Sequence, residues 1–187
     1  MSERPIPTRP GVGAGKARLD EMLRVDHAGE VAAGPIYRGQ RAVLRGSPGA
    51  GRTLAEIADM EAQEAEHLAR FDALILQRRV RPSLLSPFWR AAGFGLGVAS
   101  ALIGEKAAHA CTEAVETVIE RHYAAQIAEI EPAEPALAAE LSRFRDDELA
   151  HRDAAVAGGA REAPGYAALG WIVRAGCRAA IRIAEKV

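Results

Sequence analysis

Apolar residues recur every three or four positions along most of the chain, which is the period expected for α-helices that bury one face. This spacing predicts helices over residues 19–44, 53–79, 135–156 and 166–186. Between the second and third of these, an apolar segment starts near Phe88 and has no charge over 91–104. It is predicted to continue as one helix to about Ile130. No stretch alternates strictly between apolar and polar positions, so the pattern predicts an all-α fold.

Glycine and proline mark the limits of these helices. Turns are predicted at 46–51 and 131–135, and Pro35 is expected to kink the first helix because proline has no amide hydrogen. The first 18 residues hold three prolines and three glycines and are predicted to form a disordered arm. Residues 19–187 are predicted to form a single domain with one core. The 14 uncharged residues at 91–104 are too few for a membrane-spanning helix, which needs about 20.

The overall composition narrows the classes of function. The chain of 187 residues has a net charge of −1 and is only 5% aromatic, which argues against a nucleic-acid-binding protein. Cys111 and Cys177 are too few for a disulfide framework and are expected to be inert packing residues. Charge is uneven, however: residues 1–18 and 161–187 each carry +3, which leaves −7 on the residues between them. An acidic middle is where we expect cation chemistry.

Two copies of a Glu-x-x-His motif lie in this acidic middle, at Glu64–His67 and Glu148–His151. Residues three apart share one face of a helix, so the two side chains of each motif can approach the same metal ion. Two such pairs arise by chance in about 8% of chains with this content of glutamate and histidine, and solvated helix faces are the simpler alternative. The motifs alone are therefore only suggestive.

A single glutamate precedes each motif at a similar distance. Glu30 lies 34 residues before Glu64, and Glu116 lies 32 residues before Glu148, with one predicted turn inside each interval. At a rise of 1.5 Å per residue, the two arms of each hairpin differ by only about 3 to 6 Å in length. The glutamates of one hairpin therefore lie at nearly the same height, and the chain is predicted to use a helical hairpin twice.

These residues are also predicted to face the interior, since apolar residues such as Met60 and Phe144 flank the motifs at helical spacing. Buried carboxylates and imidazoles are costly unless they are paired or bound to metal. Ferritin-like di-iron and di-manganese bundles use one glutamate from each of two helices and a Glu-x-x-His from each of the other two. The six residues that fill these places are Glu30, Glu64, His67, Glu116, Glu148 and His151.

Mixed carboxylate and imidazole ligands favour iron or manganese, and the ligand types alone do not separate the two metals. A histidine ligand usually donates its second N–H to a neighbouring oxygen. Asp26 or Asp147 could accept that hydrogen bond, although a surface position suits either aspartate equally well.

Several short segments carry a further signal. They are RVDHAGE (24–30), IYRGQ (36–40), RVRPS (79–83), ALIGEK (101–106), ACTEAVE (110–116), RDDELAHRD (145–153) and AGCR (175–178). In these segments, which extend from about residue 19 to the C-terminus, the chain resembles the demethoxyubiquinone hydroxylase family. The resemblance implies a ferritin-like di-iron monooxygenase of ubiquinone biosynthesis, with two iron ions held by the same six residues and NADH as the electron source. The chain has no glycine-rich dinucleotide fingerprint.

The resemblance also bears on two further pairs of neighbouring residues. His122 and Tyr123 match a His-Tyr pair of the family and could relay electrons or protons near the quinone, although a packing role fits them equally well. Gly34–Pro35 departs from the family pattern just after Glu30, which puts the geometry of the first helix in question.

Basic residues lie beside apolar ones in two segments. Three arginines at 78–81 precede the apolar residues 84–104, and arginines recur every four positions from Arg174 to Arg182, close to Trp171. This combination favours an anionic membrane surface, where an insoluble polyprenyl demethoxyquinone would be met. We therefore expect a peripheral membrane protein on the cytoplasmic face of the inner or cell membrane. The alternative is that both segments pack into the bundle or into a homo-oligomer.

Two other functions are compatible with the same residues. One is a ferritin-like iron-binding protein or oxidase that has no quinone substrate. The other is a non-catalytic membrane adaptor within a quinone-biosynthesis complex. The expected partners of the hydroxylase are the quinone, the lipid bilayer and, where it assembles, further copies of itself or such a complex.

Overall fold

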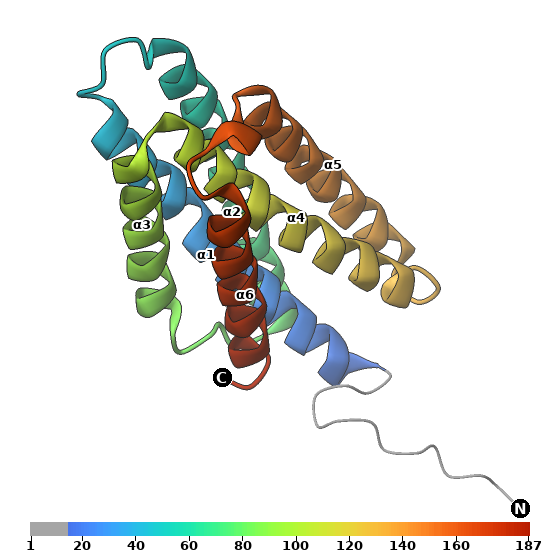
Figure 1. The fold of residues 1–187 in the computed structure, drawn as a ribbon. Helices are drawn as coiled ribbons and strands as arrows, with labels where there is room; N and C mark the ends of the chain where they lie inside the picture. The colour runs from blue at the N-terminus through green and yellow to red at the C-terminus, as the bar shows by residue number, and fades with distance from the viewer. Residues whose placement is uncertain (1–14) are drawn as a thin grey trace, which may run out of the picture.

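The computed structural model describes residues 15–187, which contain helices and no β-strand (Figure 1). The elements are α1 (Lys16–Leu44), α2 (Gly51–Arg78), α3 (Ser86–Ile103), α4 (Glu105–Ile130), α5 (Pro135–Ala157), the short 3₁₀ helix η1 (Ala160–Glu162) and α6 (Tyr166–Ala184). The predicted all-α fold is therefore confirmed. Most of the predicted arm lies outside the described residues, and α1 begins three residues before the expected start at position 19.

Four of the helices form a bundle. α1 and α2 make one helical hairpin and α4 and α5 make the other (Figure 1). Side chains of all four helices share a core. Leu23 of α1, Phe71 of α2, Tyr123 of α4 and Leu141 of α5 are each at most 1% exposed in this core. The two predicted hairpins are thus the structural units of the bundle.

The expectation of one helix from the apolar segment through to Ile130 is wrong, because Gly104 separates α3 from α4. Its φ of 139° and ψ of 169° lie in a region that only glycine adopts readily. The helical period on both sides of Gly104 gives no sign of this change in backbone direction. α3 is consequently a separate helix that runs alongside α1 in the same direction (Figure 1).

Helix α3 packs unusually closely on α1 through glycine. A Cβ atom added to Gly93 would collide with the Ala32 carbonyl, and one added to Gly97 would collide with the Ile36 carbonyl. The close approach needs glycine at these two positions. Helix α1 itself continues through Pro35 to Leu44, so the Gly34–Pro35 departure does not end it.

The expected apolar surface of α3 and α6 is divided between the interior and the outside. Trp89 and Val173 are buried against the bundle, whereas Phe88, Trp171 and Ile172 are exposed. The other exposed large apolar side chains of these two helices are Phe94, Leu102, Ile103 and Ile183. Within residues 15–187, no helix is both long enough and apolar enough to cross a membrane.

Candidate metal centre

All six predicted ligands lie in the middle of the bundle, and each is at most 4% exposed. They form two groups whose oxygen and nitrogen atoms lie within 4.8 Å of one another. The first group is Glu30, Glu64, His67 and Glu148, and the second is Glu64, Glu116, Glu148 and His151. The two Glu-x-x-His glutamates belong to both groups, which is the arrangement expected for carboxylates that bridge two metal ions.

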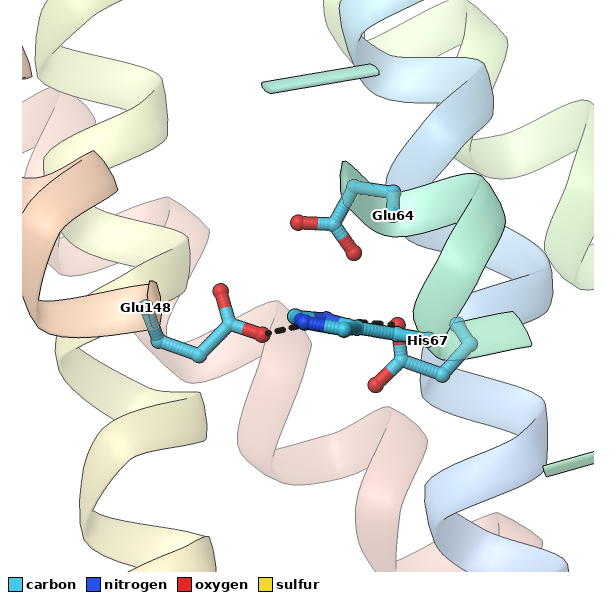
Figure 2. A group of neighbouring side chains, drawn as sticks. Glu64, His67 and Glu148 are labelled. Carbon is cyan, nitrogen blue, oxygen red and sulfur yellow. Dashed lines mark ion pairs between the residues drawn. The ribbon is translucent and has the colours of Figure 1, made fainter. Parts of the chain in front are cut away.

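Figure 2 shows three of these side chains converging from opposite hairpins. Glu64 and His67 extend from α2, and Glu148 extends toward them from α5, with the His67 Nδ1 atom 3.5 Å from Glu148 Oε1. His151 Nδ1 is 3.3 Å from Glu64 Oε1 and 3.4 Å from Glu148 Oε2. Both imidazoles thus present their Nδ1 atoms to the carboxylates.

The Nε2 atom of each histidine lies within hydrogen-bond distance of a side chain from the opposite hairpin. His67 Nε2 lies 3.1 Å from Asp147 Oδ2, and His151 Nε2 lies 2.6 Å from Gln63 Oε1. An Nε2–H that donates to these oxygens leaves the Nδ1 lone pair free for a cation. Asp147 occupies the predicted position. Gln63 was missed, although it and Asp147 each directly precede the glutamate of a motif, a repeat that the sequence does show.

The two remaining glutamates each accept a hydrogen bond from a buried tyrosine. Tyr37 Oη donates to Glu116 Oε1 at 2.7 Å, and Tyr123 Oη donates to Glu30 Oε1 at 2.5 Å. Each tyrosine follows the glutamate of its own helix by seven residues and bonds to the glutamate of the other. Sequence reasoning singled out Tyr123 and missed Tyr37, which the repeated Glu-x₆-Tyr spacing would have identified.

Asp26 is not next to a histidine of the cluster. Its Oδ1 atom accepts a hydrogen bond of 2.8 Å from Gln126 Nε2 and lies 3.2 Å from His122 Nε2. The Gln126 Nε2 atom also lies 3.0 Å from His122 Nε2. The prediction of Asp26 as the partner of a ligand histidine is therefore corrected to a partner of His122, one layer away from the cluster.

The polar atoms at the centre of the cluster lack protein partners, which is a direct test of whether the site suits metal ions. The buried atoms without a hydrogen bond are Glu30 Oε2, Glu64 Oε1 and Oε2, His67 Nδ1, Glu148 Oε2 and His151 Nδ1. Leaving such atoms unsatisfied in a protein interior costs several kcal/mol in total. Two divalent cations would satisfy these atoms and balance the charge of four carboxylates, so the donor set fits a dinuclear metal centre.

The raised pKa values of three carboxyl groups also indicate a site that suits metal ions. Burial, together with the negative charge of neighbouring glutamates, raises the pKa of Glu30 and of Glu116 well above the usual value. Burial and the charge of Glu148 raise the pKa of Glu64 to about 8. Crowded carboxylates that resist ionisation together are typical of sites that need a cation.

Glu148 behaves differently because it touches both histidines. Burial favours its neutral form, but contacts with His151 and His67 outweigh burial and lower its pKa to about 2. The same contacts raise the pKa of His67 to about 9 and that of His151 to about 11, although burial opposes both shifts. In the absence of metal, protons on the imidazoles thus supply part of the positive charge that the carboxylates require, and a bound cation would replace them.

An apolar cavity of about 110 Å³ leads to this cluster between α1, α3, α4 and α6. Its apolar walls include Trp89, Ile119 and Ile181, and carboxylates of the cluster, among them Glu30 and Glu116, line it as well. The cavity also reaches His122, Tyr123, Asp26, Cys177, Glu64 and Glu148. A molecule with an apolar body could therefore bring one end of itself to the cluster.

A four-helix bundle whose two helical hairpins enclose four carboxylates and two imidazoles is a ferritin-like protein of the dinuclear carboxylate class. Residues 17–184 match the family described as "Ubiquinone biosynthesis protein COQ7", and the chain belongs to that family. The match begins within the first turn of α1 and includes all six residues of the cluster.

Curated relatives from bacteria and eukaryotes agree with this family. A 3-demethoxyubiquinol 3-hydroxylase of Rhodospirillum rubrum is 46% identical over 95% of this chain and 82% of its own length. The human mitochondrial NADPH-dependent 3-demethoxyubiquinone 3-hydroxylase is 43% identical over 92% of this chain and 79% of its own. The mitochondrial 5-demethoxyubiquinone hydroxylase of Saccharomyces cerevisiae is 41% identical over 91% of this chain and 79% of its own length.

Proposed function

We propose that this protein is a 3-demethoxyubiquinol 3-hydroxylase of ubiquinone biosynthesis, a monooxygenase with a dinuclear iron centre. The observation that carries the proposal is the apolar cavity that reaches the buried carboxylate cluster. Glu30 and His67 would hold one iron and Glu116 and His151 the other, while Glu64 and Glu148 belong to both groups of ligands. When bound, the iron pair supplies the activation of O2 and the redox chemistry that side chains alone cannot provide.

The chain itself supplies position and a dry environment. The walls of the cavity, among them Trp89 and Ile181, accept the apolar part of a demethoxyquinol and exclude water from the reacting ring. Tyr37 and Tyr123 each hold one oxygen of a glutamate, which restricts how Glu116 and Glu30 can turn. The ring that is to be hydroxylated would then stop at the end of the cavity, next to the cluster.

His122 and Tyr123 are proposed to move protons between the quinol and the cluster. Both side chains line the cavity, and Tyr123 Oη donates to Glu30 Oε1. Asp26 and Gln126 orient the His122 ring through its Nε2 atom. A proton can therefore reach Glu30 from the cavity by way of a buried hydroxyl.

The source of electrons is proposed to be a reduced nicotinamide nucleotide. The human relative is named NADPH-dependent, whereas the resemblance of the sequence implied NADH. Residues 15–187 contain no β-strand and hence no strand–helix–strand unit for a dinucleotide. Transfer from the nucleotide to a quinone already held in the cavity would need no such unit.

Membrane association is proposed for the side of the molecule formed by α3 and α6. Phe88, Trp171 and Ile172 are exposed there, and Arg178 and Arg182 lie on the exposed part of α6. Apolar side chains beside arginines favour peripheral binding to an anionic bilayer. The apolar cavity is bounded by the same two helices, so a prenylated substrate could pass from lipid to the cluster without crossing water.

The decisive experiment measures nucleotide oxidation and hydroxylated product in the same reaction. Iron-loaded protein is mixed anaerobically with NADH or NADPH, with and without a short-chain demethoxyquinone, and O2 is then admitted. We expect nucleotide oxidation that depends on the quinone, and a product heavier by one oxygen atom in mass spectrometry. Iron oxidation by O2 with no hydroxylated product would instead support the ferritin-like oxidase, and failure of the protein to take up iron when it is loaded would support the adaptor.

A further inference from the structure

A second cavity reaches the carboxylate cluster from the opposite side of α1, and it differs in character from the apolar one. Its volume is about 100 Å³, and it lies between α1, α2 and α3. Glu30 and Glu64 line it where the side chains are buried, and Arg38, Glu61 and Arg90 line it where side chains are at least partly exposed. Apolar residues, among them Val31 and Leu68, line it as well, but charged groups accompany this route from the surface to the cluster, and we call it the polar cavity.

We propose that this polar cavity is the path by which the metal ions enter the folded protein, separate from the apolar path of the quinone. The inference rests on the proposed metal centre. A hydrated divalent cation loses much of its hydration free energy in an apolar passage, because nothing there replaces the water oxygens. Carboxylates along the polar cavity replace them step by step.

Glu61 is the first carboxylate along this route. It precedes Glu64 by three residues on α2 and so shares one face of the helix with it. Both oxygens of Glu64 are buried and without hydrogen-bond partners, which leaves them free to receive an ion from the cavity. A cation that reaches Glu61 thus has its next ligand one helical turn further in.

Arg38 lines the outer, exposed part of the route and is paired there with Glu61. Its Nε atom is 3.3 Å from Glu61 Oε1, and 56% of its side chain is exposed. Glu61 keeps a second partner, Arg41, at 2.5 Å. An ion pair this exposed contributes at most about 1 kcal/mol, so Arg38 can leave Glu61 at little cost when a cation arrives.

Gly34 lies on the wall of this cavity and allows the route to be blocked without replacing a ligand. A Cβ atom added to Gly34 would be 3.9 Å from Arg38 Nη2 and from Glu64 Cβ, which is ordinary contact distance. Alanine therefore fits at this position, while the longer side chain of leucine would fill the cavity. The neighbouring Ala33 lines the apolar cavity instead and provides a matched control on the same helix.

The test measures how fast the metal-free full-length protein takes up Fe²⁺ alone under anaerobic conditions. Iron that is still accessible to a chromogenic chelator is measured over time, and the final iron content is measured separately. We expect Gly34→Leu to slow uptake at least about tenfold, because a filled cavity closes the route. Its final content should equal that of the wild type, and Gly34→Ala and Ala33→Leu should load at nearly the wild-type rate.

Uptake by Gly34→Leu at the wild-type rate would overturn the proposal, as would a slow rate confined to Ala33→Leu. If Gly34→Leu does not fold, Glu61→Gln and Arg38→Gln decide instead. The first is expected to slow uptake and the second to accelerate it, each by about threefold to tenfold, through the change in local charge. Unchanged rates in both would overturn the proposal, whereas a wild type that binds no iron would refute the metal centre itself.

Discussion

Tyr37 on α1 donates a hydrogen bond of 2.7 Å to Glu116 on α4. Tyr123, seven residues after Glu116 on α4, donates an equivalent hydrogen bond to Glu30 on α1. The partners of the two histidines repeat this exchange, with Asp147 bound to His67 and Gln63 bound to His151. The cluster is thus built from two equivalent halves, each oriented by residues of the other hairpin.

Replacing Tyr37 with phenylalanine removes one hydrogen bond and keeps the ring. Glu116 Oε1 would lose its partner in a buried position, so we expect the free energy of unfolding of the metal-free protein to fall by about 1 to 3 kcal/mol. Tyr123→Phe should have a similar effect through Glu30. Urea denaturation measures both changes, and a loss confined to one variant would contradict the equivalence of the two halves.

Replacing a glutamate that belongs to both groups should abolish metal binding. Glu64→Ala or Glu148→Ala removes an oxygen ligand from both groups at once, so we expect little or no iron in the purified protein and no hydroxylation. Glu66→Ala, on the exposed side of α2, is the control and should keep its iron. Wild-type iron content in Glu148→Ala, measured by elemental analysis, would show that the metal lies elsewhere.

Asp147→Asn tests the hydrogen bond to His67 without changing any ligand. An amide accepts more weakly than a carboxylate and can turn its NH2 group toward the ring, so the orientation of His67 is less well held. We expect iron affinity to fall about 10-fold to 100-fold. Competition with a chelator of known affinity measures this change, and an unaltered affinity would mean that Asp147 has no part in metal binding.

Removing the metal should lower the stability of the protein. Ions that bind only the folded state stabilise it by about 2.7 kcal/mol when their free concentration is 100 times the dissociation constant. We therefore expect the iron-loaded protein to melt at a higher temperature than the chelator-treated one. The difference should vanish in Glu64→Ala, and a difference that persisted in that variant would reveal binding outside the cluster.

The two cysteines should be unreactive while the protein is folded. Burial raises the pKa of Cys111 to about 12 and that of Cys177 to about 11. Between pH 9 and these values, the unfolded chain carries thiolates while the folded chain keeps its thiols protonated, so stability falls as pH rises through this range. Iodoacetamide at pH 8.5 should label both residues slowly before denaturation and rapidly after it, whereas rapid labelling of the folded protein would show that they are accessible.

The helical period predicted most of the elements because it depends on residues close together in the sequence. α2, α5 and α6 lie within two residues of their predicted limits at both ends. The prediction failed at Gly104, where a single glycine reverses the chain without disturbing the apolar pattern on either side. It also treated the apolar residues of α3 and α6 as one surface, although Trp89 and Val173 point inward.

The sequence by itself determined which residues gather at the centre, since the spacing of Glu30, Glu64, Glu116 and Glu148 sets their heights along two hairpins of similar length. Only the tertiary structure decided which partner each of them has. The bond from Tyr37 to Glu116 and the contact of Asp26 with His122 depend on how one hairpin packs against the other. That packing also opens two separate cavities to the cluster, on opposite sides of α1, which no local pattern encodes.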